Sequence, residues 1–129
     1  MLADCRARFP QGLETGMAGW TTGGELPARW VIHVVGPNYA AGERDRGLLV
    51  ACYANALATA DGLGASTVAF PLVSAGIYGW PLDDAATIAV DTLRATPTSV
   101  ARSILVAFNA SAYDALRRAM ETGPPPNDR

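Results

Sequence analysis

Residues 67–81 decide the fold of this chain: the run Thr67-Val68-Ala69-Phe70-Pro71-Leu72-Val73 leads into the loop Ser74-Ala75-Gly76-Ile77-Tyr78-Gly79-Trp80-Pro81. The run is apolar at odd and even positions alike, which is typical of a strand that is covered on both faces. Two further runs, residues 30–35 and 103–108, are also rich in β-branched and apolar residues. We therefore expect three central strands rather than edge strands.

Between and after these runs, apolar residues recur at the spacing of one face of a helix. The first stripe ends at Gly62 and Gly64, which predicts the end of a helix there. The second begins at Asp83 and Asp84, where the positive end of the helix dipole favours acids, and stops before Pro97. The two stripes consist of Leu48, Leu49, Cys52, Tyr53, Ala56, Leu57 and Ala60, and of Ala85, Ala86, Ala89, Val90 and Leu93.

Strands that alternate with helices predict an α/β fold with a mostly parallel central sheet. A last helix is expected at about residues 112–120, while residues 2–8 fit one or two helical turns and residues 15–22 a short strand or a loop. A chain of 129 residues has room for one domain. We place that domain at residues 1–122 and expect the Pro-rich tail 123–129 to be disordered.

Composition excludes several classes of function. The net charge is −2, which supplies no general attraction for nucleic acid or for an anionic membrane. No stretch offers the roughly 18 consecutive apolar residues of a membrane span, and the first residues do not read as a signal peptide, so a cytoplasmic location is expected. Cys5 and Cys52 lie too far apart in sequence for a metal-ligand pair and are too few for a disulfide framework.

The loop after the second run is the strongest candidate site. In open parallel sheets, ligands gather at the carboxyl ends of the strands. Gly76 and Gly79 permit a close approach of the backbone, and the next helix begins with unpaired N–H groups, which suits a phosphate or pyrophosphate. Tyr78 and Trp80 are candidates for stacking on a sugar or a base. An alternative stays open: the two glycines merely let the chain turn between strand and helix.

Other polar residues give no catalytic site. His33 is the only histidine and lies in an apolar strand, so we interpret it as a hydrogen-bonded structural residue. No second histidine, cysteine cluster or carboxylate pair accompanies it, so neither a metal site nor a catalytic triad can be assembled, and no cofactor is predicted. Phe108 and Asn109 follow the last strand and therefore lie at the sheet end where a ligand is expected.

The order and spacing of several motifs resemble the macro domain, from about Leu2 to Met120. These motifs are residues 31–37, the pair Cys52-Tyr53, residues 68–71 and, above all, residues 74–81, with weaker likeness at residues 12–18 and 26–29. The resemblance implies a three-layer α/β/α sandwich that binds ADP-ribose. It implies an adenosine side near Phe108 and Asn109, and a loop that wraps the pyrophosphate and distal ribose through its backbone amides: Ser74, Ala75, Gly76, Ile77, Tyr78 and Gly79.

The chain also departs from the family pattern. Members of the family carry a first half before the helix that residues 2–6 resemble, with an adenine-recognising acid, an Asn-Ala-Ala-Asn strand end and a glycine-rich loop around the distal ribose. This sequence contains none of these. We therefore expect an N-terminally truncated macro domain with fewer strands. Because such a loss exposes a sheet edge, we also expect a homo-oligomer or a partner that covers it.

The function expected from these observations is weak binding of ADP-ribose or a related nucleotide diphosphate, without catalysis and with no catalytic residue assigned. Hydrolysis of ADP-ribosyl or O-acetyl-ADP-ribose esters is an alternative if the missing first half is supplied. A third alternative is an interaction module without a ligand, in which the exposed sheet edge pairs with a partner.

Overall fold

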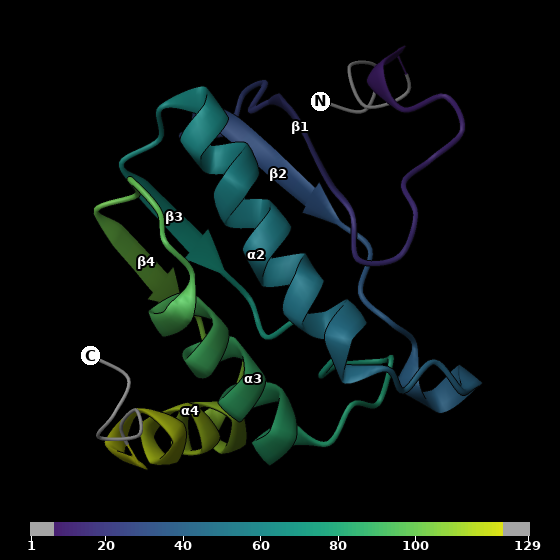
Figure 1. Ribbon diagram of the computed structural model, residues 1–129, viewed down its shortest axis with the longest axis vertical. Helices are drawn as coiled ribbons and strands as arrows, with labels where there is room; N and C mark the ends of the chain where they lie inside the picture. The colour runs from purple at the N-terminus through teal and green to yellow at the C-terminus, as the bar shows by residue number, and fades with distance from the viewer. Residues whose placement is uncertain (1–6, 123–129) are drawn as a thin grey trace.

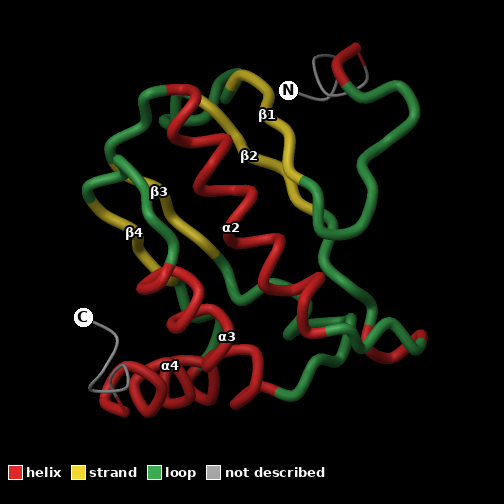
Figure 2. Tube along the Cα trace, in the orientation of Figure 1, coloured by secondary structure: helices red, strands yellow, loops and turns green. Residues whose placement is uncertain are grey.

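The computed structural model of the protein describes residues 7–122. Four strands, three α-helices and one short 3-10 helix lie wholly within this range (Figure 1 and Figure 2). In chain order these are β1 (Ala18–Thr22), β2 (Trp30–Val34), η1 (Tyr39–Ala41), α2 (Arg46–Leu63), β3 (Thr67–Phe70), α3 (Leu82–Ala95), β4 (Arg102–Leu105) and α4 (Ala110–Thr122).

The strands form two separate pairs. β1 and β2 are antiparallel, with Trp20 opposite Ile32, and β3 and β4 are parallel, with Ala69 opposite Ile104. In Figure 1, β2, β3 and β4 point the same way, but β2 and β3 are not hydrogen-bonded to each other. The expectation of central strands is therefore wrong for the residues that the structure describes, because each strand has only one neighbour. Ile104 on β4 is accordingly 37% exposed.

Helix α2 crosses in front of the strands and organises the core (Figure 1). The side chain of Asp45 accepts a hydrogen bond from the Gly47 N–H (2.8 Å) at the helix start. Gly64, with φ of 74°, ends the helix, whereas Gly62 lies inside it. Of the predicted apolar stripe only Leu48 is not fully buried, so the helical spacing is confirmed; the buried members are Leu49, Cys52, Tyr53, Ala56, Leu57 and Ala60.

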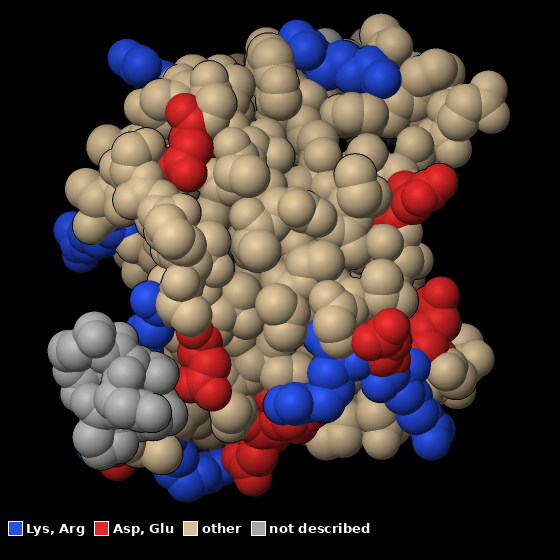
Figure 3. Space-filling view, viewed as in Figure 1, with Lys and Arg blue, Asp and Glu red and all other residues tan. Residues whose placement is uncertain are grey.

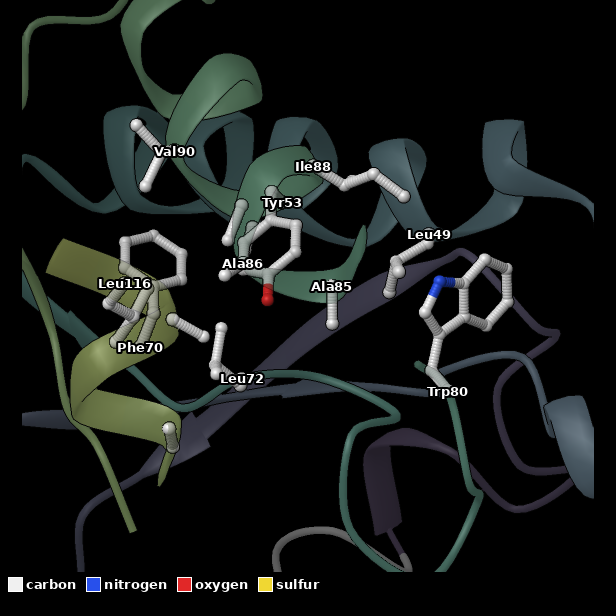
Figure 4. Packing of buried hydrophobic residues seen from close by; sticks show 14 of the residues in the cluster. Leu49, Tyr53, Phe70, Leu72, Trp80, Ala85, Ala86, Ile88, Val90 and Leu116 are labelled. Atoms are coloured by element: carbon white, nitrogen blue, oxygen red, sulfur yellow. The ribbon is translucent and has the colours of Figure 1, made fainter. Parts of the chain in front are cut away.

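Helices α3 and α4 complete the core. α3 packs against both α2 and α4, and buries small side chains such as Ala85, Ala86 and Ala89, which allow a close approach of the helices. Figure 4 shows how α3 residues meet Tyr53, Leu49 and Leu116 in one apolar cluster. The last helix is longer at both ends than predicted. It starts earlier because the Asn109 side chain accepts a hydrogen bond from the Ala112 N–H (2.8 Å) and so caps its first turn.

The ends of the chain are described only in part. The predicted turns at residues 2–8 fall mostly outside the described residues, although residues 7 and 8 are helical. The tail 123–129 also lies outside them. Residues 18–22 form β1, so the strand interpretation of that segment is confirmed. Within residues 7–122, no helix combines the length and the apolar character needed to cross a bilayer.

A polar network holds the start of α3 to α2. The Asp84 carboxylate accepts hydrogen bonds from Arg46 Nη2 (2.8 Å) and Nε (3.2 Å), and from Trp80 Nε1 (2.9 Å). The hydrogen bond from Arg46 is the main reason that the pKa of Asp84 lies below its usual value.

In Figure 3, charged side chains of both signs gather at the lower end of the molecule, while the middle of this face is uncharged.

The variant Asp84→Asn should lose stability in a pH-dependent way. The pKa of Asp84 is lower in the folded than in the unfolded chain. Its carboxylate therefore adds to the free energy of unfolding at pH values above the unfolded pKa of 3.8, and this contribution disappears as the pH falls through the folded pKa. Because both ion-pair partners are partly exposed, screening limits the expected loss to about 0.5–1 kcal/mol near neutral pH. Urea unfolding at about pH 7 and about pH 2.5 measures this, and the difference between variant and parent should shrink at the lower pH.

The control is Glu25→Gln, which makes the same carboxylate-to-amide change at an exposed residue. An equal loss in both variants, or an Asp84→Asn loss that persists at low pH, would contradict the role assigned to the network.

Candidate functional site

The loop at residues 74–81 lies where the chain leaves β3 and enters α3. It faces the segment that follows β2, and the two enclose a hollow of about 370 Å³. The hollow is lined by Val34, Gly36, Pro71, Leu72, Val73, Ser74, Gly76, Ile77 and Tyr78. The predicted loop residues are therefore placed beside the carboxyl ends of two parallel strands.

The loop keeps its shape through its own backbone. The Trp80 N–H donates to the Ser74 carbonyl (2.9 Å) and the Gly79 N–H to the Gly76 carbonyl (3.0 Å), while the Ala40 N–H of η1 donates to the Tyr78 carbonyl (2.9 Å). None of the hydrogen bonds between described residues uses the N–H groups at positions 76, 77 and 78. Consecutive free N–H groups in a loop can bind the oxygens of an anion.

Ser74 is held in an unusual conformation. Its φ is 67°, the only positive value at a non-glycine among residues 7–122, and its buried Oγ has no hydrogen-bond partner there. Backbone strain of this kind costs about 1–3 kcal/mol and is found mostly at functional sites. The two features mark Ser74 as the point where the loop is most constrained.

Gly36 allows the loop to approach the end of β2. A Cβ atom at this position would clash with Ser74 Oγ and would lie 2.6 Å from Val73 Cγ1. Real Cβ atoms do not come so close to their neighbours, so any side chain here forces the loop away. The hollow depends on this glycine.

Tyr53 of α2 positions the start of the loop, a role that the sequence analysis did not find. Its hydroxyl accepts a hydrogen bond from the Val73 N–H (2.9 Å) and donates to the Pro71 carbonyl (3.4 Å). Burial raises the pKa of Tyr53 well above its usual value, so the hydroxyl keeps its proton at neutral pH. The sequence did contain a signal for this role. Tyr53 is a tyrosine in an otherwise apolar helical stripe, and a buried tyrosine hydroxyl needs a hydrogen-bond partner.

Trp80 does not face the hollow. Its side chain is 2% exposed, donates to Asp84 and lies edge-to-face on Tyr39 with ring centroids 5.1 Å apart. Stacking of Trp80 on a ligand, considered from the sequence, does not fit this burial. Tyr78 and Ile77 instead lie at the surface, and Ile77 is 98% exposed.

The start of α3 is also less available to an anion than expected. Asp83 and Asp84 occupy its first turn and already interact with the helix dipole. Asp83 in addition accepts a hydrogen bond from Arg118 (2.7 Å). The free donors of this site are therefore those of the loop.

Of the remaining candidate residues, Asn109, His33 and Cys52 have structural partners, whereas Phe108 is exposed. Phe108 and Asn109 follow β4 and are exposed, and Asn109 caps α4. His33 Nε2 lies 2.9 Å from the hydroxyl of Thr21 on β1, which confirms the hydrogen-bonded histidine. Cys52 is buried, and desolvation raises the pKa of its thiol to about 11. In the part of the chain that the structure describes, no cluster of His, Cys, Asp and Glu could hold a metal ion.

Comparisons with known proteins agree with this geometry. The family model for the macro domain matches residues 1–89. A macro domain-containing protein of Streptomyces coelicolor is 54% identical over 119 residues, which are 89% of this chain and 70% of that protein. The chain belongs to the macro domain family. Both the resemblance and the α/β class of the fold are thereby confirmed.

Two further proteins that are similar to this chain have names that mention ADP-ribose or its acetyl ester. A macrodomain of Oceanobacillus iheyensis, solved with ADP-ribose, superposes with a TM-score of 0.86 at 30% identity, over 94% of this chain and 69% of that one. This likeness supports the predicted three-layer sandwich. A Pantoea vagans protein named O-acetyl-ADP-ribose deacetylase 1 is 41% identical over 120 residues, which are 88% of this chain and 70% of that protein.

The pair Gly36→Ala and Gly62→Ala tests the close approach between β2 and the loop. At Gly36 the added methyl group meets Ser74 and Val73, so we expect a loss of about 1–3 kcal/mol. At Gly62, inside α2, a methyl group meets nothing within 4 Å and should stabilise the helix by about 0.5–1 kcal/mol. Urea unfolding compares the two variants, and unchanged stability of Gly36→Ala would refute the contact.

Proposed function

We propose that this macro domain binds ADP-ribose or a related nucleotide diphosphate through the loop Ser74–Gly79. The observation that carries the proposal is the run of three N–H groups at positions 76–78, which have no partner among the described residues and border the hollow beside β2 and β3. A pyrophosphate offers several anionic oxygens to such donors. The ADP-ribose in the Oceanobacillus macrodomain supports this choice of ligand.

The residues of the loop have distinct parts in the proposal. Gly76 leaves open space above the backbone, since an added Cβ there meets nothing within 4 Å, and a phosphate can therefore reach the N–H groups. Ser74 and Ala75 fix the turn, while Ile77, Tyr78 and Gly79 form its outer part. Phe108 and Asn109 are proposed to lie toward the adenosine side, because both follow β4 at the same end of the strands.

We propose binding that is weak and without catalysis. The loop supplies backbone donors, and its only polar side chains are those of Ser74 and Tyr78. No arginine lies within it, so attraction of the pyrophosphate rests on uncharged N–H groups.

Hydrolysis of O-acetyl-ADP-ribose is the second candidate, favoured by the name of the Pantoea vagans relative. Release of acetate from O-acetyl-ADP-ribose by the purified chain measures it directly. A rate above that of the Gly76→Glu variant would establish an enzyme, and a rate equal to the uncatalysed background would support binding alone.

Three expectations from the sequence stay predictions. They are the single domain at residues 1–122, the disordered tail at residues 123–129 and the cytoplasmic location.

Isothermal titration with ADP-ribose tests the binding proposal. We expect saturable heat with the parent chain and at least a tenfold weaker affinity in Gly76→Glu, because the added carboxylate occupies the space above the N–H groups and repels the pyrophosphate. The control is Gly62→Glu, which adds the same charge at an open position of α2 outside the loop.

The proposal is wrong if a folded parent chain gives no heat at millimolar ADP-ribose. It is also wrong if Gly76→Glu binds as well as Gly62→Glu, because the ligand would then lie elsewhere.

A further inference from the structure

Side-chain packing does not fix the backbone of the loop at Gly76 and Ile77. Gly76 has no side chain, and that of Ile77 is 98% exposed. An added Cβ atom at Gly76 would meet nothing within 4 Å. A peptide unit in such a segment can rotate unless a hydrogen bond holds its C=O or its N–H group. The direction of the loop donors therefore depends on the hydrogen bonds of the neighbouring backbone.

A hydrogen bond inside the loop fixes one of these peptide units. The Gly79 N–H donates to the Gly76 carbonyl (3.0 Å) across the turn. Every peptide bond between described residues is trans, and the C=O and N–H groups of a trans peptide point in opposite directions. The Ile77 N–H belongs to the same peptide unit as the Gly76 carbonyl. It therefore points out of the turn, where a ligand oxygen can reach it.

The short helix η1 holds the next peptide unit from outside the loop. It lies between β2 and α2 in sequence, beside the loop that enters α3 (Figure 1), and its Ala40 N–H donates to the Tyr78 carbonyl (2.9 Å). The Gly79 N–H shares a peptide unit with that carbonyl and points the other way, toward Gly76. We call these two bonds the amide relay, which ends at the Ile77 N–H. In such a series each hydrogen bond polarises the next, so the last N–H becomes a better donor.

Ala40 is the residue of η1 whose N–H leaves the turn. The N–H groups at positions 41–43 all donate to the carbonyl of Asn38 or of Tyr39, inside the turn. The Asn38 side chain also accepts from the Ala41 N–H (3.2 Å) and so caps the turn. The turn therefore keeps these bonds whether or not it contacts the loop, and the Ala40 N–H acts on the loop alone.

Aromatic side chains hold η1 against the end of the loop. The Tyr39 ring lies edge-to-face on Trp80, with ring centroids 5.1 Å apart. The Arg44 guanidinium lies 4.3 Å from the centroid of the Tyr39 ring, and its Nε donates to the Tyr39 carbonyl (3.2 Å). Because Trp80 is buried and donates to Asp84, these contacts fix η1 relative to the start of α3.

We propose that η1 positions the loop for nucleotide binding, and that the Ala40 N–H directs the Ile77 N–H toward the pyrophosphate through the amide relay. Ala40 is a positioning residue, because it acts through Tyr78 and Gly79. Residues 38–44 do not line the hollow, so their part in binding is indirect. This inference rests on the proposed function of the loop and adds a second segment of the chain to it.

Two matched proline variants separate the relay from the turn. Ala40→Pro removes the N–H that bonds to the loop, whereas Ala41→Pro removes the N–H that bonds to Asn38. Both residues are exposed and belong to the same 3-10 helix. Ala40→Gly keeps the N–H and is the conservative variant. Circular dichroism and urea unfolding show that each variant is folded.

The first measurement needs no ligand. Hydrogen exchange of the Gly79 amide, followed by NMR, reports its bond to the Gly76 carbonyl. We expect exchange at least tenfold faster in Ala40→Pro than in the parent chain, because the peptide unit between Tyr78 and Gly79 is then free to rotate. Exchange in Ala41→Pro and in Ala40→Gly should equal that of the parent chain.

The second measurement is isothermal titration calorimetry with ADP-ribose. We expect the affinity of Ala40→Pro to be at least tenfold weaker than that of the parent chain, and the affinities of Ala41→Pro and Ala40→Gly to change less than twofold. Tyr39→Ala reaches the relay by a second route, because it removes the contact with Trp80 and keeps every backbone donor. It should speed the exchange of Gly79 and weaken ADP-ribose binding at least threefold.

The outcomes distinguish this inference from the proposed function. A folded parent chain that gives no heat with ADP-ribose would refute the proposed function and the positioning role with it. If the parent chain binds, the positioning role alone is refuted by parent-like affinity or parent-like Gly79 exchange in both Ala40→Pro and Tyr39→Ala. An equal loss of affinity in Ala41→Pro and Ala40→Pro would also refute it, because the loss would then come from the turn and not from the relay.

Discussion

The hydrogen bonds of the Tyr53 hydroxyl connect the core to the candidate site. They fix the backbone at Pro71 and Val73, and these residues line the hollow beside the loop. A buried hydroxyl without a partner costs about 1–3 kcal/mol, so the segment after β3 cannot move away from α2 without that loss. The apolar packing of α2 therefore determines where the loop begins.

The same constraint explains why an unfavourable conformation persists at Ser74. The loop enters from a fixed point at Val73, leaves into α3 through the buried Trp80, and passes within contact of Gly36. Trp80 is held in turn by Asp84, which Arg46 of α2 also binds. With both ends anchored, the chain between them adopts a positive φ at a serine. The energy of that strain is offset by the core on either side of the loop.

Local patterns predicted the elements well because they depend on near neighbours in sequence. The spacing of Leu49, Tyr53 and Leu57 gave α2, and the loop residues fell at the carboxyl end of β3 as expected. Strand pairing is different, because an apolar run has the same sequence pattern whether or not neighbouring strands are present. Trp80 was also misjudged: its partner Asp84 lies one helical turn away, and only the folded loop shows that the indole turns inward. The Tyr53 hydroxyl needed the same non-local information.

The hollow beside the loop adjoins a space of about 280 Å³ between β2, β3 and α2. Val34, Pro71 and Val73 line both, so a shift of this segment alters the two spaces together. None of the described residues that line the hollow carries a charge, and Arg46, whose side chain reaches the start of α3, is already bound to Asp84. The wall of the hollow therefore offers a ligand its shape and its backbone donors rather than a positive side chain, and the contacts that hold Pro71 and Val73 in place decide that shape.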